Sequence, residues 1–153
     1  ATPEVVLGAS LLAMFLSLSI NPGFLTTVIA HIMFCVSFVV VTVKARIASL
    51  DPRLEQAAMD LYANEFETFR RVTLPLVMPG IAGAALLAFS LSFDDFIITN
   101  FNSGTMMTFP KFVYVSSARG IPPQANVIGS LMFFIALAIV IAGQFVGRKR
   151  QRA

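Results

Sequence analysis

The segment "FSLSFDDFIITNF", residues 89–101, places two adjacent carboxylates, Asp94 and Asp95, in an otherwise apolar or weakly polar stretch. Ionisable groups inside membrane-spanning helices are costly and generally face a water-filled path or a partner group. Aromatic rings beside the pair offer faces that attract cations and cover methylene groups: Phe89, Phe93 and Phe96. This combination favours a pathway for a cation over one for a sugar or an anion.

A helical projection leaves open which aspartate faces such a path. Small residues, which let helices pack closely, recur at every fourth position: Gly80, Ala84, Ala88 and Ser92. At about 100° per residue, Asp95 lies close to this stripe and Asp94 lies about a quarter turn away. A second interpretation is that the pair lies at the outer end of its span and is solvated, because polar residues follow from Asn100.

The composition is that of a membrane protein. Of the 153 residues, 57% are hydrophobic and 12% are charged, with a mean hydropathy of +0.82, whereas soluble domains carry about a quarter charged residues. The apolar stretches cover residues 5–20, 24–43, 76–98 and 126–147. The last three have the roughly 20 residues that a spanning helix needs. The first is shorter, so we expect a partial span whose beginning is missing. The sequence predicts an all-α integral membrane helical bundle in which residues 1–153 form one transmembrane domain and a fragment of a longer protein.

Basic residues predict the orientation, because Lys and Arg stay preferentially on the cytoplasmic side. They gather between the second and third stretches and after the fourth: Lys44, Arg46, Arg53, Arg70, Arg71, Arg148, Lys149, Arg150 and Arg152. We therefore expect a multi-pass protein of the cytoplasmic (inner) membrane, with the loop 44–75 and the C-terminus in the cytoplasm and the loop 99–125 outside. The same distribution accounts for the net charge of +3 without a nucleic acid partner.

The cytoplasmic loop contains capping signals for two short helices. Asp51 is a good N-cap and Pro52 suits the first helical position, and apolar residues follow at helical spacing. Asn64 with Glu67 matches a capping box, which predicts a second helix over 65–72. Two dipeptides are expected to restart the chain into the next span: Leu74-Pro75 and Pro79-Gly80. An apolar face here should dock on a partner, and the alternative is a helix that lies on the membrane surface.

The residues of this loop keep one spacing: Gln56-Ala57-Ala58, three residues, Tyr62, nine residues, Val72, one residue, Leu74-Pro75. This resembles the EAA motif of permease subunits of ABC importers, which has Glu, Gly and Ile where this chain has Gln56, Tyr62 and Val72. The resemblance implies the type I permease fold of ABC importers, with a coupling helix seated in a groove of the ATPase subunit. Because Gly lets two backbones approach closely, Tyr62 is the departure that bears on the tightness of docking.

The resemblance implies ATPase coupling for a set of residues around this helix: Gln56, Ala57, Ala58, Leu61, Tyr62, Glu65, Arg70, Leu74 and Pro75. It extends along nearly the whole chain through "TPEVVLGASLL", "HIMFCVSFVVVTVKARI" and "LSFDDFIITNF", which resemble the second permease subunit of spermidine/putrescine importers. Such subunits have six spans, so this chain would lack the N-terminal ones. By resemblance, Asp94 is the favoured substrate-pathway carboxylate, with Glu4 at the partial span and Glu65 on the cytoplasmic side. The expected pathway residues are Asp94, Asp95, Glu4 and Phe93.

The implied function is ATP-driven import of polyamines by alternating access. The implied partners are an ABC ATPase subunit dimer, a second permease subunit, an extracytoplasmic substrate-binding protein and the lipid membrane. The sequence contains no G-x-x-x-x-G-K-[ST] loop to cradle phosphates. We therefore expect no enzyme and no cofactor bound by this chain, with ATP and Mg held by the partner ATPase. Lys111 and Arg119 are candidate contacts to the binding protein, or else solvated charges.

Two other functions stay open at this point. One is an ABC permease for another solute, such as ferric iron, thiamine or phosphonate, and the aspartate pair argues for a cation instead. The other is a non-transporting channel-like or assembly protein, which would leave the two capped helices without a purpose. His31 and Cys35 lie four residues apart and have the chemistry of metal ligands. Because no further ligand of that kind lies nearby, we expect them to be packing residues and expect no metal site.

Overall fold

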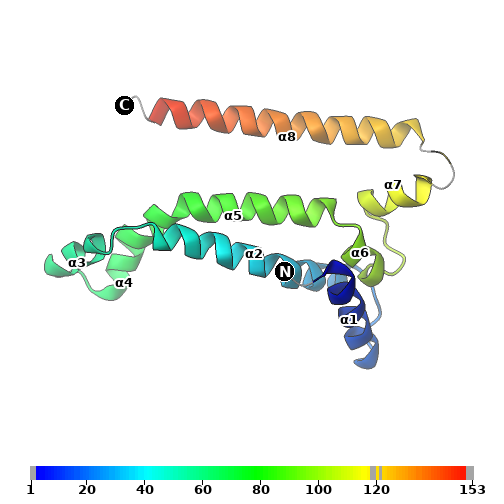
Figure 1. Ribbon diagram of the computed structural model, residues 1–153, viewed down its shortest axis with the longest axis horizontal. Coiled ribbons are helices and arrows are strands. Elements are labelled where there is room, and N and C mark those ends of the chain that lie inside the picture. Colours follow the sequence, from blue (N-terminus) through cyan, green and yellow to red (C-terminus); the bar gives the residue numbers. More distant parts are fainter. Residues whose placement is uncertain (1–2, 118–119, 121, 151–153) are drawn as a thin grey trace. The chain divides into compact units, whose positions relative to one another are not determined.

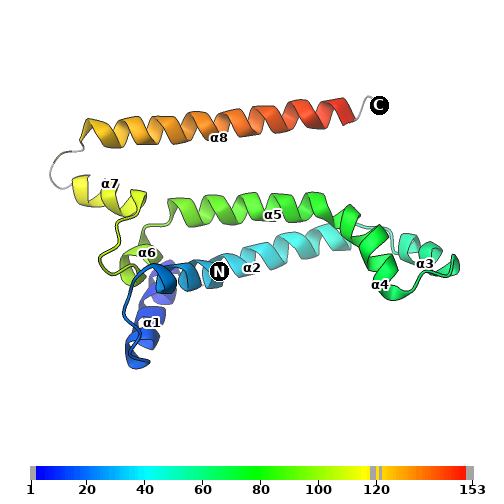
Figure 2. The same cartoon turned by 180° about the vertical axis from the view of Figure 1, so that it is seen from behind.

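The computed structural model describes residues 3–117, 120 and 122–150, and within these ranges the chain forms helices and no β-strand. It divides into two units, residues 1–110 and 111–153. In the first unit, α2 (Phe24–Ala48) and α5 (Leu74–Asp94) run antiparallel and side by side (Figures 1 and 2). α1 (Glu4–Ser17) and α6 (Ile97–Asn102) pack together at one end of this pair, and α3 (Arg53–Asp60) and α4 (Glu65–Thr68) lie at the other.

The buried core of the first unit lies where α1, α2 and α6 meet. Its fully buried apolar side chains are Leu11, Phe15, Ala30, Phe34, Cys35 and Ile98. Elsewhere along α2 and α5 many large apolar side chains are exposed, among them Val41, Leu86 and Phe89. In the described residues, α2 and the continuous segment Glu65–Asp94 are long and apolar enough to cross a membrane. Their exposed apolar faces therefore suit contact with lipid or with neighbouring spans.

The short helix α3 has defined ends. At its start, the Asp51 carboxylate accepts a hydrogen bond from the backbone N–H of Arg53 at 2.9 Å. The helix begins at Arg53 with Pro52 as its N-cap, one residue later than the predicted start. At its end, Tyr62 has a φ of +64°, and Ala63 N–H donates to the carbonyl of Ala58. This is the Schellman arrangement, whose left-handed residue is usually glycine. The left-handed backbone at this position explains why the EAA motif has glycine where this chain has Tyr62.

The predicted capping box before α4 is confirmed, because Asn64 and Glu67 bond each other's backbone N–H. The predicted end of this helix at residue 72 is wrong. The chain continues through the π-helical turn η1 (Phe69–Thr73) directly into α5. The N–H of Leu74 donates to the carbonyl of Phe69, five residues back. This wider turn makes room for the ring of Pro75, which would otherwise break a regular helix.

α7 (Phe109–Ser117) lies within the expected loop 99–125. Gly120, further along this loop, has a φ of +92°, a conformation that favours glycine. In the second unit, α8 (Pro123–Arg150) contains the expected span 126–147. Its 28 residues rise about 42 Å, enough to cross the hydrocarbon layer. Arg119 and Arg152, which the sequence analysis singled out, lie outside the described residues.

Candidate functional site

The helix over residues 76–98 that the sequence predicted is interrupted at the aspartate pair. α5 ends at Asp94, and Asp95 is extended, with a ψ of 121°. The Asp95 carboxylate accepts hydrogen bonds from the backbone N–H groups of Ile98, at 3.2 Å, and Thr99, at 2.8 Å. Those N–H groups open α6 and have no partner inside the helix, so Asp95 both allows the break and caps the new helix.

Asp95 and Asp94 differ sharply in environment. Asp95 is 8% exposed, whereas Asp94 is exposed. The interpretation that the pair is solvated is therefore wrong for Asp95, whose charge is held by backbone donors in the interior. Asp94 is the last residue of α5, and its side chain is accessible to solvent. The two neighbours thus have separate roles: Asp95 holds the helix break and Asp94 presents a carboxylate.

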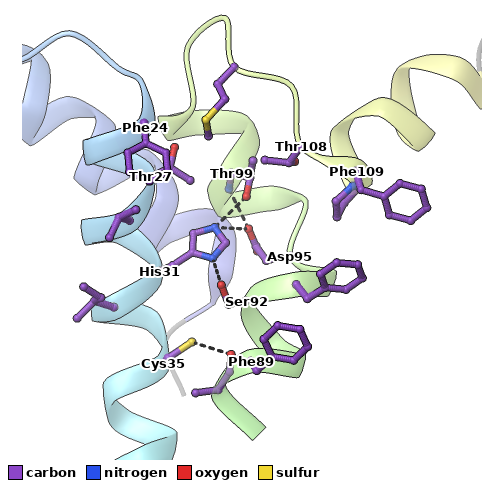
Figure 3. Close-up of a pocket in the computed structure, with 16 residues that line it drawn as sticks. Phe24, Thr27, His31, Cys35, Phe89, Ser92, Asp95, Thr99, Thr108 and Phe109 are labelled. Atoms are coloured by element: carbon purple, nitrogen blue, oxygen red, sulfur yellow. Dashed lines mark hydrogen bonds and ion pairs between the residues drawn. The ribbon is translucent and has the colours of Figure 1, made fainter. Parts of the chain in front are cut away.

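His31 of α2 spans the break from the side (Figure 3). Its Nδ1 lies 2.7 Å from the Ser92 hydroxyl, on the last turn of α5, and its Nε2 lies 2.8 Å from the Thr99 hydroxyl of α6. The same Nε2 is 3.5 Å from the Asp95 carboxylate. We call His31, Ser92, Asp95 and Thr99 the brace. It corrects the expectation that His31 is a packing residue, because the ring makes directed polar contacts with two helices.

Cys35 lies one turn along α2 from His31, and its thiol donates to the carbonyl of Ala88 at 3.5 Å. Among the residues that the structure describes, no group of three or more His, Cys, Asp or Glu side chains is placed to hold a metal ion. The two side chains therefore act here as links between α2 and α5.

The brace forms one wall of an open pocket of about 600 Å³ in the first unit. Aromatic rings also line this pocket, among them Phe89 and Phe109 (Figure 3). The rings of Phe89 and Phe93 are stacked at 5.9 Å between centroids, and those of Phe93 and Phe109 at 6.3 Å. The sequence predicted Phe89 and Phe93 in this setting. The lining is overwhelmingly apolar, so it suits hydrocarbon with few polar groups.

A second hollow, of about 550 Å³, lies on the other side of the break. Glu4 of α1 and Asp94 of α5 both line it, together with Asp95 and the rings of Phe34 and Phe96. Among the described residues that line it there is no Lys, Arg or His. The structure thus brings together three of the four expected pathway residues, Glu4, Asp94 and Asp95, and places Phe93 in the neighbouring pocket.

The expected coupling residues lie at the opposite end of the α2–α5 pair. Most are exposed there: Gln56, Ala57, Leu61, Tyr62, Glu65, Arg70 and Pro75, with Ala58 and Leu74 partly buried. The side chain of Leu61 is 81% exposed and that of Tyr62 is 98% exposed. Phe66, four residues further along the chain on α4, is exposed too. We call Leu61, Tyr62 and Phe66 the apolar tip.

Two contacts that the sequence did not predict link the helices at this end of the first unit. The Thr73 hydroxyl donates to the Glu55 carboxylate at 2.7 Å, which links α3 to the π-helical turn. The Arg46 guanidinium donates to the carbonyl of Leu76 through Nε at 3.1 Å and through a terminal nitrogen at 2.9 Å, which links α2 to α5. Their position as polar residues inside or beside an apolar span was the sequence feature that could have pointed to contacts between helices. This holds for Arg46 and also for His31, Ser92 and Thr99.

In the described residues, long apolar helices carry an acidic hollow near one end and exposed apolar side chains at the other, an arrangement that suits a membrane-spanning domain. The comparisons with known proteins give the family. A family model described as "Binding-protein-dependent transport system inner membrane component" matches residues 1–149. The chain belongs to this family, which has the type I permease fold of ABC importers, as the motif spacing in the α3 to α5 segment implied.

Named relatives are permease proteins of polyamine transport systems. The chain is 37% identical over 152 residues, 99% of its length, to the spermidine/putrescine transport system permease protein PotC of Escherichia coli (strain K12). It is 34% identical over 149 residues to PotC of Haemophilus influenzae and 39% identical over 137 residues, 85% of its length, to the putrescine permease PotI of Escherichia coli. The chain spans 58% of the length of the two PotC proteins and 49% of PotI.

Proposed function

We propose that this chain forms part of the permease of an ATP-driven importer for polyamines, spermidine or putrescine. The observation that carries the proposal is the hollow lined by Glu4, Asp94 and Asp95, where acidic groups from α1 and α5 meet without a basic residue in the described lining. A polyamine carries several ammonium groups on a methylene chain. Carboxylates would attract the ammonium groups, and the rings of Phe34 and Phe96 would cover the methylenes and add cation–π attraction.

Of the two aspartates, Asp94 is the one proposed to meet the substrate. The Asp95 carboxylate already accepts two backbone hydrogen bonds, whereas Asp94 is exposed at the hollow. Phe93 directly precedes the two aspartates in the sequence, and its ring lines the adjoining apolar pocket. There it would contact the methylene groups of the substrate.

The proposed partner at the other end is an ABC ATPase pair that receives the apolar tip. Exposed Leu61, Tyr62 and Phe66 need a covering surface if this end lies in the cytoplasm, as the positive charges of the loop favour. Movement of α3 would pass through the Glu55–Thr73 hydrogen bond to the π-helical turn and on into α5, which carries Asp94. A second permease subunit and an external substrate-binding protein complete the proposed assembly. ATP and Mg would be held by the ATPase and not by this chain.

The alternative within the family is an importer for another solute, such as ferric iron, thiamine or phosphonate. Phosphonate is an anion and fits the acidic hollow poorly, because like charges repel across it. Ferric iron and thiamine are cations, so uptake of spermidine and putrescine themselves must separate them from a polyamine.

The test is radiolabelled spermidine and putrescine uptake in cells that express the complete transport system, with the full-length subunit carrying Asp94→Asn. Glu67→Gln is the matched control, because it removes one carboxylate at the far end of the unit and keeps the capping box. Uptake should fall at least about tenfold in Asp94→Asn, the loss of one charge-assisted contact, and stay near normal in the control. Normal uptake with Asp94→Asn would contradict the proposed pathway, and a wild-type system that imports no polyamine would contradict the substrate class.

A further inference from the structure

We propose that His31 is a positioning residue of the transport pathway: it fixes the α5–α6 break and thereby the place of the Asp94 carboxylate. The expected effect of His31 on uptake rests on the proposed function. The claim that His31 fixes the position of Asp94 does not depend on which solute is carried. It starts from the brace, in which one ring on α2 joins both sides of the break.

The ring has a defined direction. Its Nε2 faces the Asp95 carboxylate at 3.5 Å and the Thr99 hydroxyl at 2.8 Å, and a carboxylate accepts hydrogen bonds without donating. The proton is therefore assigned to Nε2, which donates to the Thr99 oxygen and faces the negative charge. Nδ1 then accepts from the Ser92 hydroxyl. One neutral ring thus satisfies a donor on α5 and an acceptor on α6.

Different contacts restrain the two sides of the break. Between Ser92 and Thr99 the chain leaves the helix at Asp95 and Phe96, where regular backbone hydrogen bonds stop. The Asp95 carboxylate restrains the α6 side through the N–H groups of Ile98 and Thr99. The α5 side, which ends in Asp94, is tied across the break by the Ser92–His31–Thr99 contacts. Removing the ring would free the last turn of α5 and let the Asp94 carboxylate move relative to Glu4.

The two sides of the ring can be tested separately. In His31→Gln the side-chain amide reaches the place of Nε2 and can still donate to Thr99, whereas His31→Ala loses both contacts. Met33→Ala is the matched control, because Met33 lies on an exposed face of the same helix. Thr99→Val removes the α6 contact without changing side-chain volume and serves if His31→Ala does not assemble.

The measurement uses the full-length subunit in the assembled transporter, with Asp94→Cys in a Cys35→Ala background. The rate of modification by a charged methanethiosulfonate reagent reports the position of residue 94, and Ser90→Cys, one turn earlier, reports the rest of α5. We expect His31→Ala to change the rate at position 94 at least about fivefold, the effect of one buried hydrogen bond, with little change at position 90. His31→Gln keeps the Thr99 contact but loses the Ser92 contact on α5, so it should leave the rate at position 94 changed. Equal rates at position 94 in wild type and His31→Ala would overturn the proposal, whatever the solute.

With Asp94 intact, His31→Ala should lower polyamine uptake at least about fivefold while assembly and basal ATP hydrolysis stay normal. A residue that only stabilises the fold would lower all three together, and that result would overturn the positioning role. If the wild-type transporter takes up no polyamine, the proposed function fails while the labelling comparison still decides the role of His31.

Discussion

The Asp95 carboxylate lies 3.5 Å from Nε2 of His31 and also accepts the backbone N–H groups of Ile98 and Thr99, so one side chain ends α5, opens α6 and faces α2. Its neighbour Asp94 makes none of these contacts and lines the acidic hollow with Glu4. Asp95 therefore stabilises the helix break and Asp94 lines the hollow, so substitutions at the two positions should have different consequences.

Asp95→Ala should destabilise the protein, whereas Asp94→Asn should not. Removing the Asp95 carboxylate leaves the N–H groups of Ile98 and Thr99 unpaired in the interior, a loss of about 1–3 kcal/mol. Asp95→Asn keeps an acceptor oxygen and should cost less. Thermal unfolding of the purified subunit in detergent measures this order. An equal loss of thermal stability in Asp94→Asn and Asp95→Ala would contradict the separate roles of the two aspartates.

Tyr62→Gly should stabilise the end of α3. Tyr62 has a φ of +64°, which costs a residue with a side chain about 1 kcal/mol and costs glycine little. Tyr62→Ala is the matched control, because it removes the ring and keeps the backbone penalty. Limited proteolysis of the α3–α4 segment should show more protection in Gly than in Ala. Equal protection would mean that the ring, and not the backbone, sets the stability of this turn.

Leu61→Asp should abolish uptake driven by ATP while membrane insertion stays intact. Leu61 is 81% exposed at the apolar tip, and a charge there would be buried without a partner on docking. Leu61→Met keeps the apolar contact and serves as the control. Copurification of the ATPase with the subunit measures the docking directly. Retained copurification and uptake in Leu61→Asp would remove the apolar tip from the coupling assignment.

The sequence predicted the helices well, because long apolar runs and capping residues act locally. The start of α2 at Phe24, the presence of α8 over 126–147 and the capping box at Asn64 follow from neighbours within a few positions. The predicted end of the second span at residue 43 is wrong, because α2 continues to Ala48 through Lys44 and Arg46. The same local reasoning misjudged Pro75, because a π-helical turn, which depends on five-residue spacing, carries the helix through it.

The sequence singled out acidic residues, but it did not reveal their connections. The aspartate pair in an apolar stretch pointed to Asp94 and Asp95, the resemblance added Glu4, and all three line one hollow. The contacts of His31 with Ser92 and Thr99 join residues 61 and 68 positions apart, and the Arg46 contact with Leu76 joins residues 30 apart. No spacing rule within one helix reaches across such distances, so only the packing of α2 against α5 and α6 reveals these pairs.

Gly80→Ala should destabilise the protein although alanine favours helices. A Cβ atom at Gly80 would lie 2.5 Å from Cγ and 2.6 Å from Cβ of Arg46, near the base of that side chain, where it cannot easily move away. Arg46 would be displaced from the carbonyl of Leu76, so the two hydrogen bonds to that carbonyl would be lost. Gly83→Ala is the matched control on the same helix, because nothing lies within 4 Å of its added Cβ. The control should gain about 0.5–1 kcal/mol from helix propensity, and Gly80→Ala should lose more than that. Thermal unfolding of both variants decides the matter, since a gain in Gly80→Ala would mean that α2 and α5 do not approach closely at Arg46.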